Sequence, residues 1–88
     1  MVKINIYSTL FCPYCTRAKM LLDQKGVEYN EIRVDMDPER RKEMIDLSGR
    51  TSVPQIFIDD DHIGGCDDLY YLEAQGGLDE KLGLVKDN

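Results

Sequence analysis

The sequence Phe11-Cys12-Pro13-Tyr14-Cys15-Thr16 places two cysteines three positions apart, with a proline directly after the first. Residues 2–7, which precede it, are apolar at every second position, as is typical of a half-buried strand. Residues 16–26 have the spacing of an amphipathic helix, and Pro13 suits the first helical position. A Cys-x-x-Cys pair between a strand and a helix predicts a redox-active dithiol.

Composition narrows the classes of protein that the chain can belong to. Of its 88 residues, 32% are charged and 42% hydrophobic, which is typical of a globular protein, and we expect one domain over residues 1–88. The net charge of -6 and the lack of a long basic run argue against a nucleic-acid or membrane partner. No segment resembles a signal peptide or a membrane span, so a cytoplasmic location is expected. In that reducing compartment, three cysteines are expected to carry chemistry or a metal rather than a disulfide framework.

Periodicity and turn residues predict the other elements along the chain. The predicted elements are strand 27–34, a helix capped by Asp37 and ending at Gly49, strands 55–58 and 62–63, a helix from about Asp67 to Gly76, and a short helix within 78–84, with 86–88 frayed. The first strand, helix and strand form a βαβ unit, which is normally right-handed and parallel. The order β-α-β-α-β-β-α predicts an α/β fold with a four-stranded mixed sheet flanked by helices.

The two cysteines of the first motif are expected to have different roles. At a helix N-terminus, free backbone N–H groups and the helix dipole stabilise an anion, which favours the thiolate of Cys12. Residues at i and i+3 share a helix face, so the sulfur of Cys15 can meet that of Cys12, and Pro13 stiffens the turn between them. We therefore expect Cys12 to be exposed and nucleophilic, and Cys15 to be more buried and to resolve the mixed disulfide.

The same pair could instead be zinc ligands or structural thiols. A structural zinc site needs about four ligands, usually arranged as two pairs. The only further candidates are Cys66 and the single histidine, His62, and there is no second Cys-x-x-Cys. We therefore expect no metal.

A second segment, Thr51-Ser52-Val53-Pro54, precedes the apolar strand 55–58. A proline at this position is awkward unless it lies in a turn or at a sheet edge. If the bond before Pro54 is cis, the backbone N–H and C=O of Val53 could pair with an extended peptide beside Cys12. An ordinary trans proline is the alternative, since about 5–6% of X–Pro bonds in folded proteins are cis.

The third segment is Gly64-Gly65-Cys66-Asp67-Asp68. Its two glycines allow a ligand to approach the backbone, and the free N–H groups of the next helix, from about Asp67, could bind a carboxylate. Asp67 could also hold a ligand ammonium, or it could simply cap the helix. Cys66 is expected to be a small buried packing residue rather than a third redox partner.

Together these segments resemble the glutaredoxins, specifically small dithiol glutaredoxins of bacterial type. The resemblance covers residues 2–82 and rests on Cys12-Pro13-Tyr14-Cys15, on Ser52-Val53-Pro54 and on Gly64-Gly65-Cys66-Asp67-Asp68-Leu69. The proline segment alone is shared with thioredoxins, whereas the other two are more specific. The resemblance implies a thioredoxin fold with Pro54 in cis and an enzyme that exchanges thiols and disulfides with glutathione as co-substrate.

The resemblance also implies a glutathione groove with the glutathione sulfur at Cys12. Cys66 and Asp67 would bind the γ-glutamyl end, and Arg41 the glycine carboxylate. The implied contact residues are Thr9, Cys12, Tyr14, Arg41, Ser52, Val53, Pro54, Gly65, Cys66 and Asp67.

Three functions follow from the sequence as alternatives. The first is a monomeric, glutathione-dependent oxidoreductase for glutathionylated or disulfide-containing proteins, with ribonucleotide reductase as a family-level substrate. The second is a thiol donor reduced by thioredoxin reductase. Thr9, where many glutaredoxins carry a lysine, favours it mildly, and the segment Gly64-Gly65-Cys66-Asp67-Asp68, which suits glutathione, argues against it. The third is an iron–sulfur cluster bridged by two chains through Cys12 and glutathione. The family resemblance implies that the stiff Pro13 and the bulky Tyr14 disfavour such a cluster.

Overall fold

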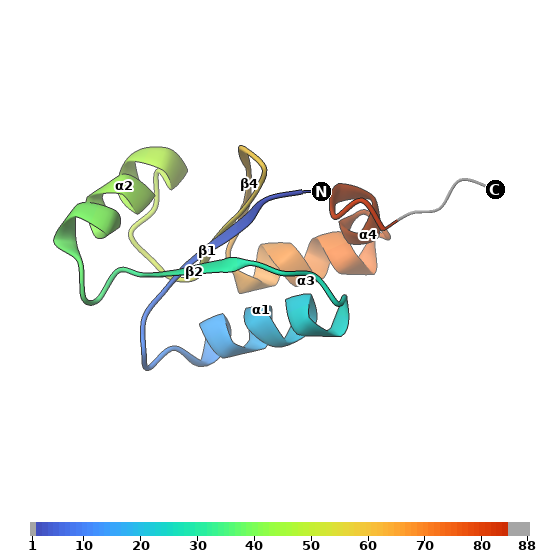
Figure 1. Cartoon of the computed structure of the whole chain (residues 1–88), viewed down its shortest axis with the longest axis horizontal. Helices are drawn as coiled ribbons and strands as arrows, with labels where there is room; N and C mark the ends of the chain where they lie inside the picture. The colour runs from blue at the N-terminus through green and yellow to red at the C-terminus, as the bar shows by residue number, and fades with distance from the viewer. Residues whose placement is uncertain (1, 85–88) are drawn as a thin grey trace.

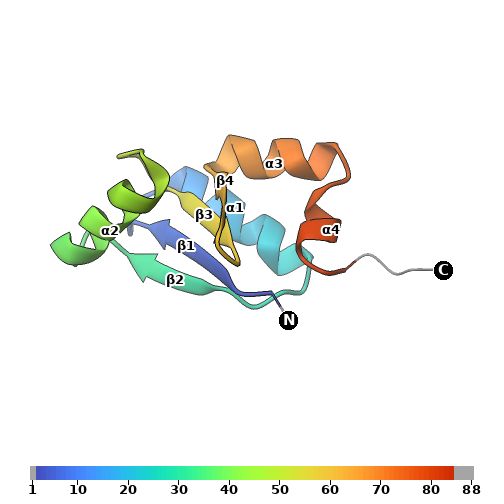
Figure 2. The same ribbon diagram turned by 90° about the horizontal axis from the view of Figure 1, so that it is seen from above.

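Four strands form one sheet in the computed structural model of the chain, which describes residues 2–84 (Figures 1 and 2). They are β1 (Ile4–Ser8), β2 (Asn30–Arg33), β3 (Gln55–Ile58) and β4 (Asp61–Gly64), in the spatial order β2-β1-β3-β4. β1 runs parallel to β2 and antiparallel to β3, and β3 runs antiparallel to β4. The prediction of a mixed four-stranded sheet is confirmed.

The helices lie on both faces of this sheet. They are α1 (Pro13–Gln24), α2 (Pro38–Ser48), α3 (Cys66–Ala74) and the short α4 (Leu78–Lys81). α1 and α3 lie on one side of the sheet and α2 on the other (Figure 1). The predicted order of elements is confirmed, although the last helix is shorter than the range 78–84, and the predicted fraying of 86–88 lies outside the described residues.

Side chains from alternate positions of the strands fill two cores, one on each face of the sheet. Ile4 and Ile6 of β1 pack with the buried side chains of α1, α3 and α4. Tyr7 points to the other face, where it packs with Phe57 and with Met44 of α2. This division follows from the pleat of a strand, which sends successive side chains to opposite faces.

The side chain of Tyr7 is buried in the smaller core, and its hydroxyl has a hydrogen-bond partner. Tyr7 is 3% exposed, and its hydroxyl donates to the Glu43 carboxylate over 2.6 Å. Burial, reinforced by this carboxylate, raises the pKa of Tyr7 to about 12. The phenol therefore stays neutral at physiological pH and joins α2 to the sheet.

Two predicted boundaries in the first half of the chain are wrong. β2 covers only Asn30–Arg33 of the predicted 27–34, because the Val27 N–H still bonds to the carbonyl of Leu22 at the end of α1. The first strand, predicted to end at residue 7, extends to Ser8, which is the last residue of β1 and is fully buried. Its hydroxyl donates to the Glu31 carboxylate over 2.6 Å, which satisfies a polar group that could not otherwise be buried.

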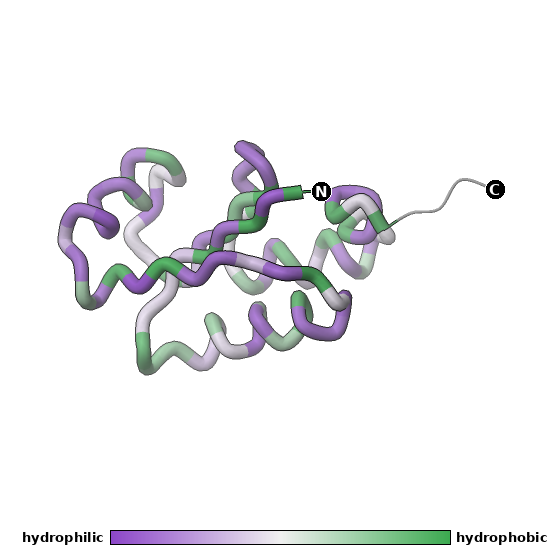
Figure 3. Tube along the Cα trace, viewed as in Figure 1, coloured by the Kyte–Doolittle hydropathy of each residue, from purple (hydrophilic) through white to green (hydrophobic). Residues whose placement is uncertain are grey.

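The strand directions bring three distant segments to the same edge of the sheet. Tyr7, near the end of β1, is paired with Gln55, the first residue of β3. Gly64, the last residue of β4, is paired with Ile56. The loop after β1, the segment before β3 and the start of α3 therefore meet there, and the tip of the first of these loops is hydrophobic (Figure 3).

Candidate active site

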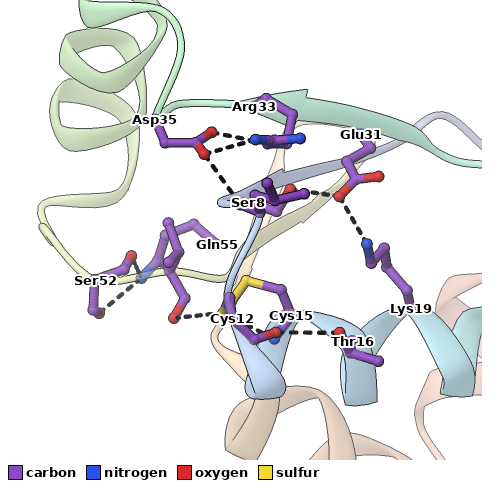
Figure 4. The surroundings of a disulfide bond; sticks show 12 residues. Ser8, Cys12, Cys15, Thr16, Lys19, Glu31, Arg33, Asp35, Ser52 and Gln55 are labelled. Carbon is purple, nitrogen blue, oxygen red and sulfur yellow. Dashed lines mark hydrogen bonds and ion pairs between the residues drawn. A yellow bond between two sulfur atoms is a disulfide. The ribbon is translucent and has the colours of Figure 1, made fainter.

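Cys12 and Cys15 form a disulfide at the start of α1, with their Cα atoms 5.1 Å apart (Figure 4). Cys12 is the N-cap of the helix, and its Sγ accepts a hydrogen bond of 3.0 Å from the Cys15 N–H. Pro13 occupies the first helical position, where a missing N–H costs nothing. The sulfur of Cys12 thus faces a backbone donor of the helix N-terminus, as the sequence predicted.

The accessibility of the two cysteines was predicted only in part. Cys15 is 1% exposed, which agrees with the expectation of a buried partner. The expectation of an exposed Cys12 is wrong, since only 9% of it is accessible. Its sulfur is bonded to Cys15 and lies 3.9 Å from the Val53 carbonyl oxygen. Cys12 is nevertheless the more accessible member of the pair.

The segment before β3 lies against the disulfide. The peptide bond between Val53 and Pro54 is cis, as the family resemblance implied. Gly65, at the N-cap of α3, lies beside Pro54, since a Cβ at this glycine would stand 3.5 Å from the Pro54 carbonyl oxygen. The structure therefore brings Cys12, Val53, Pro54 and Gly65 into one neighbourhood, although 53 positions separate the first from the last.

The other predicted site residues lie on the elements around this neighbourhood. Tyr14, Arg41, Ser52 and Asp67 are exposed, whereas Thr9 is half-buried directly after β1. Arg41 reaches from α2 to the same segment, where its guanidinium donates to the Thr51 carbonyl over 3.3 Å. Cys66 is 5% exposed and packs in the larger core, as predicted, and burial raises the pKa of its thiol.

The proposal that Asp67 caps the following helix is wrong. α3 begins at Cys66, and Asp67 lies exposed in its first turn. The Asp68 carboxylate instead reaches back and accepts the Gly65 N–H over 2.9 Å. This hydrogen bond, with Arg50 at 2.9 Å, holds the pKa of Asp68 below its usual range. Asp68 stands three positions after the N-cap residue Gly65, and a side chain at that position of a helix can reach back to the backbone N–H of the N-cap.

Comparison with known proteins identifies the family of this chain. The family model described as Glutaredoxin matches residues 4–63. The chain belongs to the glutaredoxin family. It is 58% identical to Glutaredoxin 3 of Escherichia coli (strain K12) over 82 residues, which cover 93% of this chain and 99% of that protein. Glutaredoxins are thiol–disulfide oxidoreductases, so the Cys12–Cys15 pair is a redox-active disulfide.

Solved structures support the same assignment. The solution structure of a glutaredoxin from Brucella melitensis has a TM-score of 0.84 and 53% identity, and the match covers 100% of this chain and 96% of that one. A crystal structure of a buckwheat glutaredoxin–glutathione complex has a TM-score of 0.86 and 32% identity over 93% of this chain and 77% of that one. Both relatives confirm the thioredoxin-like fold that the sequence implied.

Gln55 is a site-supporting residue of this glutaredoxin that the sequence did not single out. It is fully buried, and its amide nitrogen donates to the Ser52 carbonyl over 3.0 Å. Its amide oxygen lies 2.7 Å from Nε2 of His62, which must donate because a carbonyl oxygen can only accept. A glutamine opening an otherwise apolar strand was the signal for this contact. Gln55 thus ties the segment beside the disulfide to β4.

We expect Gln55→Leu to lower the free energy of unfolding by about 1–3 kcal/mol, because it leaves the part-buried Ser52 carbonyl and His62 N–H without the partner they have in Gln55. Urea unfolding of the purified chain measures this loss. Gln24→Leu is the matched control, since Gln24 is exposed at the end of α1. Equal stabilities of the two variants would contradict the role given to Gln55.

Two ion pairs lie near the disulfide, one between α1 and β2 and one at the end of β2 (Figure 4). Lys19 of α1 pairs with Glu31 at 2.8 Å, and this contact, with the Ser8 hydroxyl, lowers the pKa of Glu31. Arg33 pairs with Asp35 and is the main cause that lowers the pKa of Asp35 to about 2. Both carboxylates are therefore charged at neutral pH. Neither pair was predicted. Lys19 and Glu31 lie on different elements, α1 and β2, which meet only in the folded chain, whereas Arg33 and Asp35 are two positions apart and were not singled out.

Within residues 2–84, no group of three or more His, Cys, Asp or Glu side chains is placed to hold a metal ion. None of the helices of this described part is long and apolar enough to cross a membrane.

Proposed function

We propose that this glutaredoxin uses glutathione to reduce protein disulfides and mixed disulfides between proteins and glutathione, with Cys12 as the nucleophile and Cys15 as the resolving thiol. The observation that carries the proposal is the asymmetry of the disulfide. Cys12 is the more accessible member, and its sulfur faces the Cys15 N–H at the helix N-terminus. That position stabilises a thiolate, which is the attacking form of a cysteine.

The reaction with a glutathione mixed disulfide proceeds in two exchanges. The Cys12 thiolate attacks the glutathione sulfur, the disulfide to the protein breaks, and the protein leaves as a thiolate that takes up a proton. The thiolate of a free glutathione then attacks the glutathione sulfur on Cys12, which regenerates the Cys12 thiolate and releases glutathione disulfide. The net change is one protein thiol gained for one glutathione thiol oxidised.

Reduction of a protein disulfide uses both cysteines. The Cys12 thiolate attacks one sulfur, and the Cys15 thiolate then displaces the protein thiol by forming the Cys12–Cys15 disulfide. Two glutathione thiols return this disulfide to the dithiol and become glutathione disulfide. Family potentials of about -200 to -230 mV are close enough to that of a cytosolic glutathione pool for this step to proceed.

The glutathione groove of the proposal uses the residues that meet around Cys12. Val53 supplies backbone groups for the tripeptide, Gly65 allows its close approach, and Arg41 supplies a positive charge from α2. The proposed contact residues are Thr9, Cys12, Tyr14, Arg41, Ser52, Val53, Pro54, Gly65, Cys66 and Asp67. The proximity of Val53, Pro54 and Gly65 to the sulfur supports this set, as does the glutathione complex of the buckwheat relative.

We further propose the oligomeric state, the compartment and the protein partners of the reaction. The chain acts as one domain, residues 1–88, and as a monomer in the cytoplasm, where glutathione is abundant. Its partners are glutathionylated or disulfide-containing proteins, of which ribonucleotide reductase is one. The bacterial relatives support this setting.

Turnover of the mixed disulfide between cysteine and glutathione, with glutathione as the only reductant, tests the proposal directly. We expect saturable turnover that depends on glutathione. Reduction by thioredoxin reductase without glutathione would favour a thiol donor instead. Visible absorption together with bound iron and sulfide, after purification without oxygen, would favour a cluster-binding role.

A further inference from the structure

Two large apolar side chains lie at the surface directly before the reactive disulfide. Leu10 is 60% exposed and Phe11 is 91% exposed. Tyr14, on the other side of Cys12, is 56% exposed. Single exposed apolar residues are common on proteins, whereas three of them that flank one reactive sulfur in the chain form a candidate contact surface for its substrate. Figure 3 shows this hydrophobic tip of the loop between β1 and α1.

The loop that carries these side chains, which we call the apolar loop (residues 9–11), is held at both ends. The Leu10 N–H donates to the Asp35 carboxylate over 3.1 Å, and Asp35 accepts two further hydrogen bonds from Arg33, at 2.8 and 2.7 Å. On its other side, Cys12 is the N-cap of α1. A surface whose backbone is already fixed loses little conformational freedom when it binds a partner.

Residues 9–14 offer no charged side chain to a partner. The run from Thr9 to Tyr14 contains no charged residue, in a chain in which 32% of residues are charged. Asp35, the carboxylate that accepts the Leu10 N–H, is paired with Arg33. Residues 9–14 therefore suit an apolar side chain and offer an ionic one no charged partner.

The chemistry of the disulfide identifies what covers the apolar loop. Exchange requires the sulfur of the substrate to contact the sulfur of Cys12. Phe11 directly precedes Cys12 in the chain, with its Cα about 3.8 Å from that of Cys12. An extended substrate advances about 3.3 Å per residue, so residues one to three positions from its cysteine reach Phe11 and Leu10.

We propose that the apolar loop selects protein substrates whose reactive cysteine is flanked by large apolar side chains. The inference rests on the proposed function and adds a specificity surface to it, made of Leu10 and Phe11. It places the partner chain against this loop while glutathione occupies the groove beside Val53 and Gly65.

Two glutathionylated peptides that differ only in the residues flanking their cysteine test this inference. One carries leucine and phenylalanine at these positions, and the other carries serine and asparagine. We expect the intact chain to show a kcat/KM roughly tenfold higher for the apolar peptide, as burial of one such side chain allows. Equal kcat/KM values for the two peptides would overturn the proposal.

The double variant Leu10→Ser, Phe11→Ser removes the apolar loop surface. We expect it to lose the preference by lowering kcat/KM for the apolar peptide alone, with the polar peptide unaffected. Leu47→Ser is the matched control, because Leu47 is 59% exposed on α2, and it should keep the preference. A preference that survives in the double variant, with an unchanged unfolding midpoint, would overturn the role of Leu10 and Phe11.

The small disulfide of cysteine and glutathione separates failure of this inference from failure of the proposed function. If the intact chain does not turn it over with glutathione, the proposed function fails. If it does, and the two peptides react equally, only the apolar loop inference fails. A chain that elutes as a dimer, becomes monomeric in the double variant and shows no peptide preference would instead assign the loop to a second copy.

Discussion

Replacing Cys12 with serine is expected to abolish turnover of glutathione mixed disulfides, whereas Cys15→Ser is expected to retain it within about tenfold. A serine hydroxyl is not ionised near neutral pH, so the variant at position 12 lacks an attacking anion. The variant at position 15 keeps the more accessible sulfur, and glutathione can complete the second exchange without a resolving thiol. A steady-state assay with the mixed disulfide of cysteine and glutathione measures both.

The same two variants behave differently with a substrate that contains an intramolecular protein disulfide. Here Cys15→Ser is also expected to lose most activity, because the mixed disulfide between Cys12 and the protein is no longer resolved within the chain. Thermal unfolding of each variant under reducing conditions controls for folding. Equal losses for both variants on the mixed disulfide would rule out the route through Cys12 and glutathione alone.

Gly64→Ala is expected to lower the free energy of unfolding by at least about 3 kcal/mol. Gly64 is the last residue of β4 and has a φ of +118°. The backbone of residues other than glycine rarely adopts such an angle. A Cβ at this position would also lie 2.6 Å from Cγ and 2.9 Å from Cβ of Asp68. The substitution therefore strains the backbone and displaces the carboxylate that holds the Gly65 N–H. Urea unfolding measures the loss.

Gly26→Ala is the matched control for this substitution. Gly26 has a φ of +71°, but a Cβ there would meet nothing within 4 Å, so only backbone strain of about 1–2 kcal/mol is expected. If Gly64→Ala is too unstable to purify, Asp68→Gly in the same chain should recover part of the folded protein by removing the clash. Equal stabilities of the two alanine variants would show that contact with Asp68 is unimportant.

Local pattern was sufficient for most of the elements and for the chemistry of the disulfide. Alternation of apolar residues predicted β1, a continuous apolar run predicted β3, and Pro13 and Asp37 marked the starts of α1 and α2. The spacing of Cys12 and Cys15 predicted that their sulfurs meet, since residues three apart share a helix face. These features depend on neighbours within one turn or one strand, so the sequence contains the information they require.

Errors arose where the structure depends on contacts with distant residues. Helical hydrogen bonding at Val27 shortens β2, and the exposure of Cys12 is reduced by Val53, which lies 41 positions away. The capping role belongs to Asp68 rather than Asp67, since the orientation of the first turn of α3 decides which carboxylate returns to Gly65. Periodicity does not encode these contacts.

The sequence by itself determined the redox pair, the helix that carries it and the family to which the chain belongs. Only the tertiary structure decided what surrounds the pair, because strand pairing joins segments that no local pattern connects. The antiparallel pairing of β1 with β3, and of β3 with β4, brings Val53, Pro54 and Gly65 to Cys12. The anchoring of the apolar loop by Asp35 and Arg33, and the support of Ser52 by Gln55, likewise exist only once the sheet has formed.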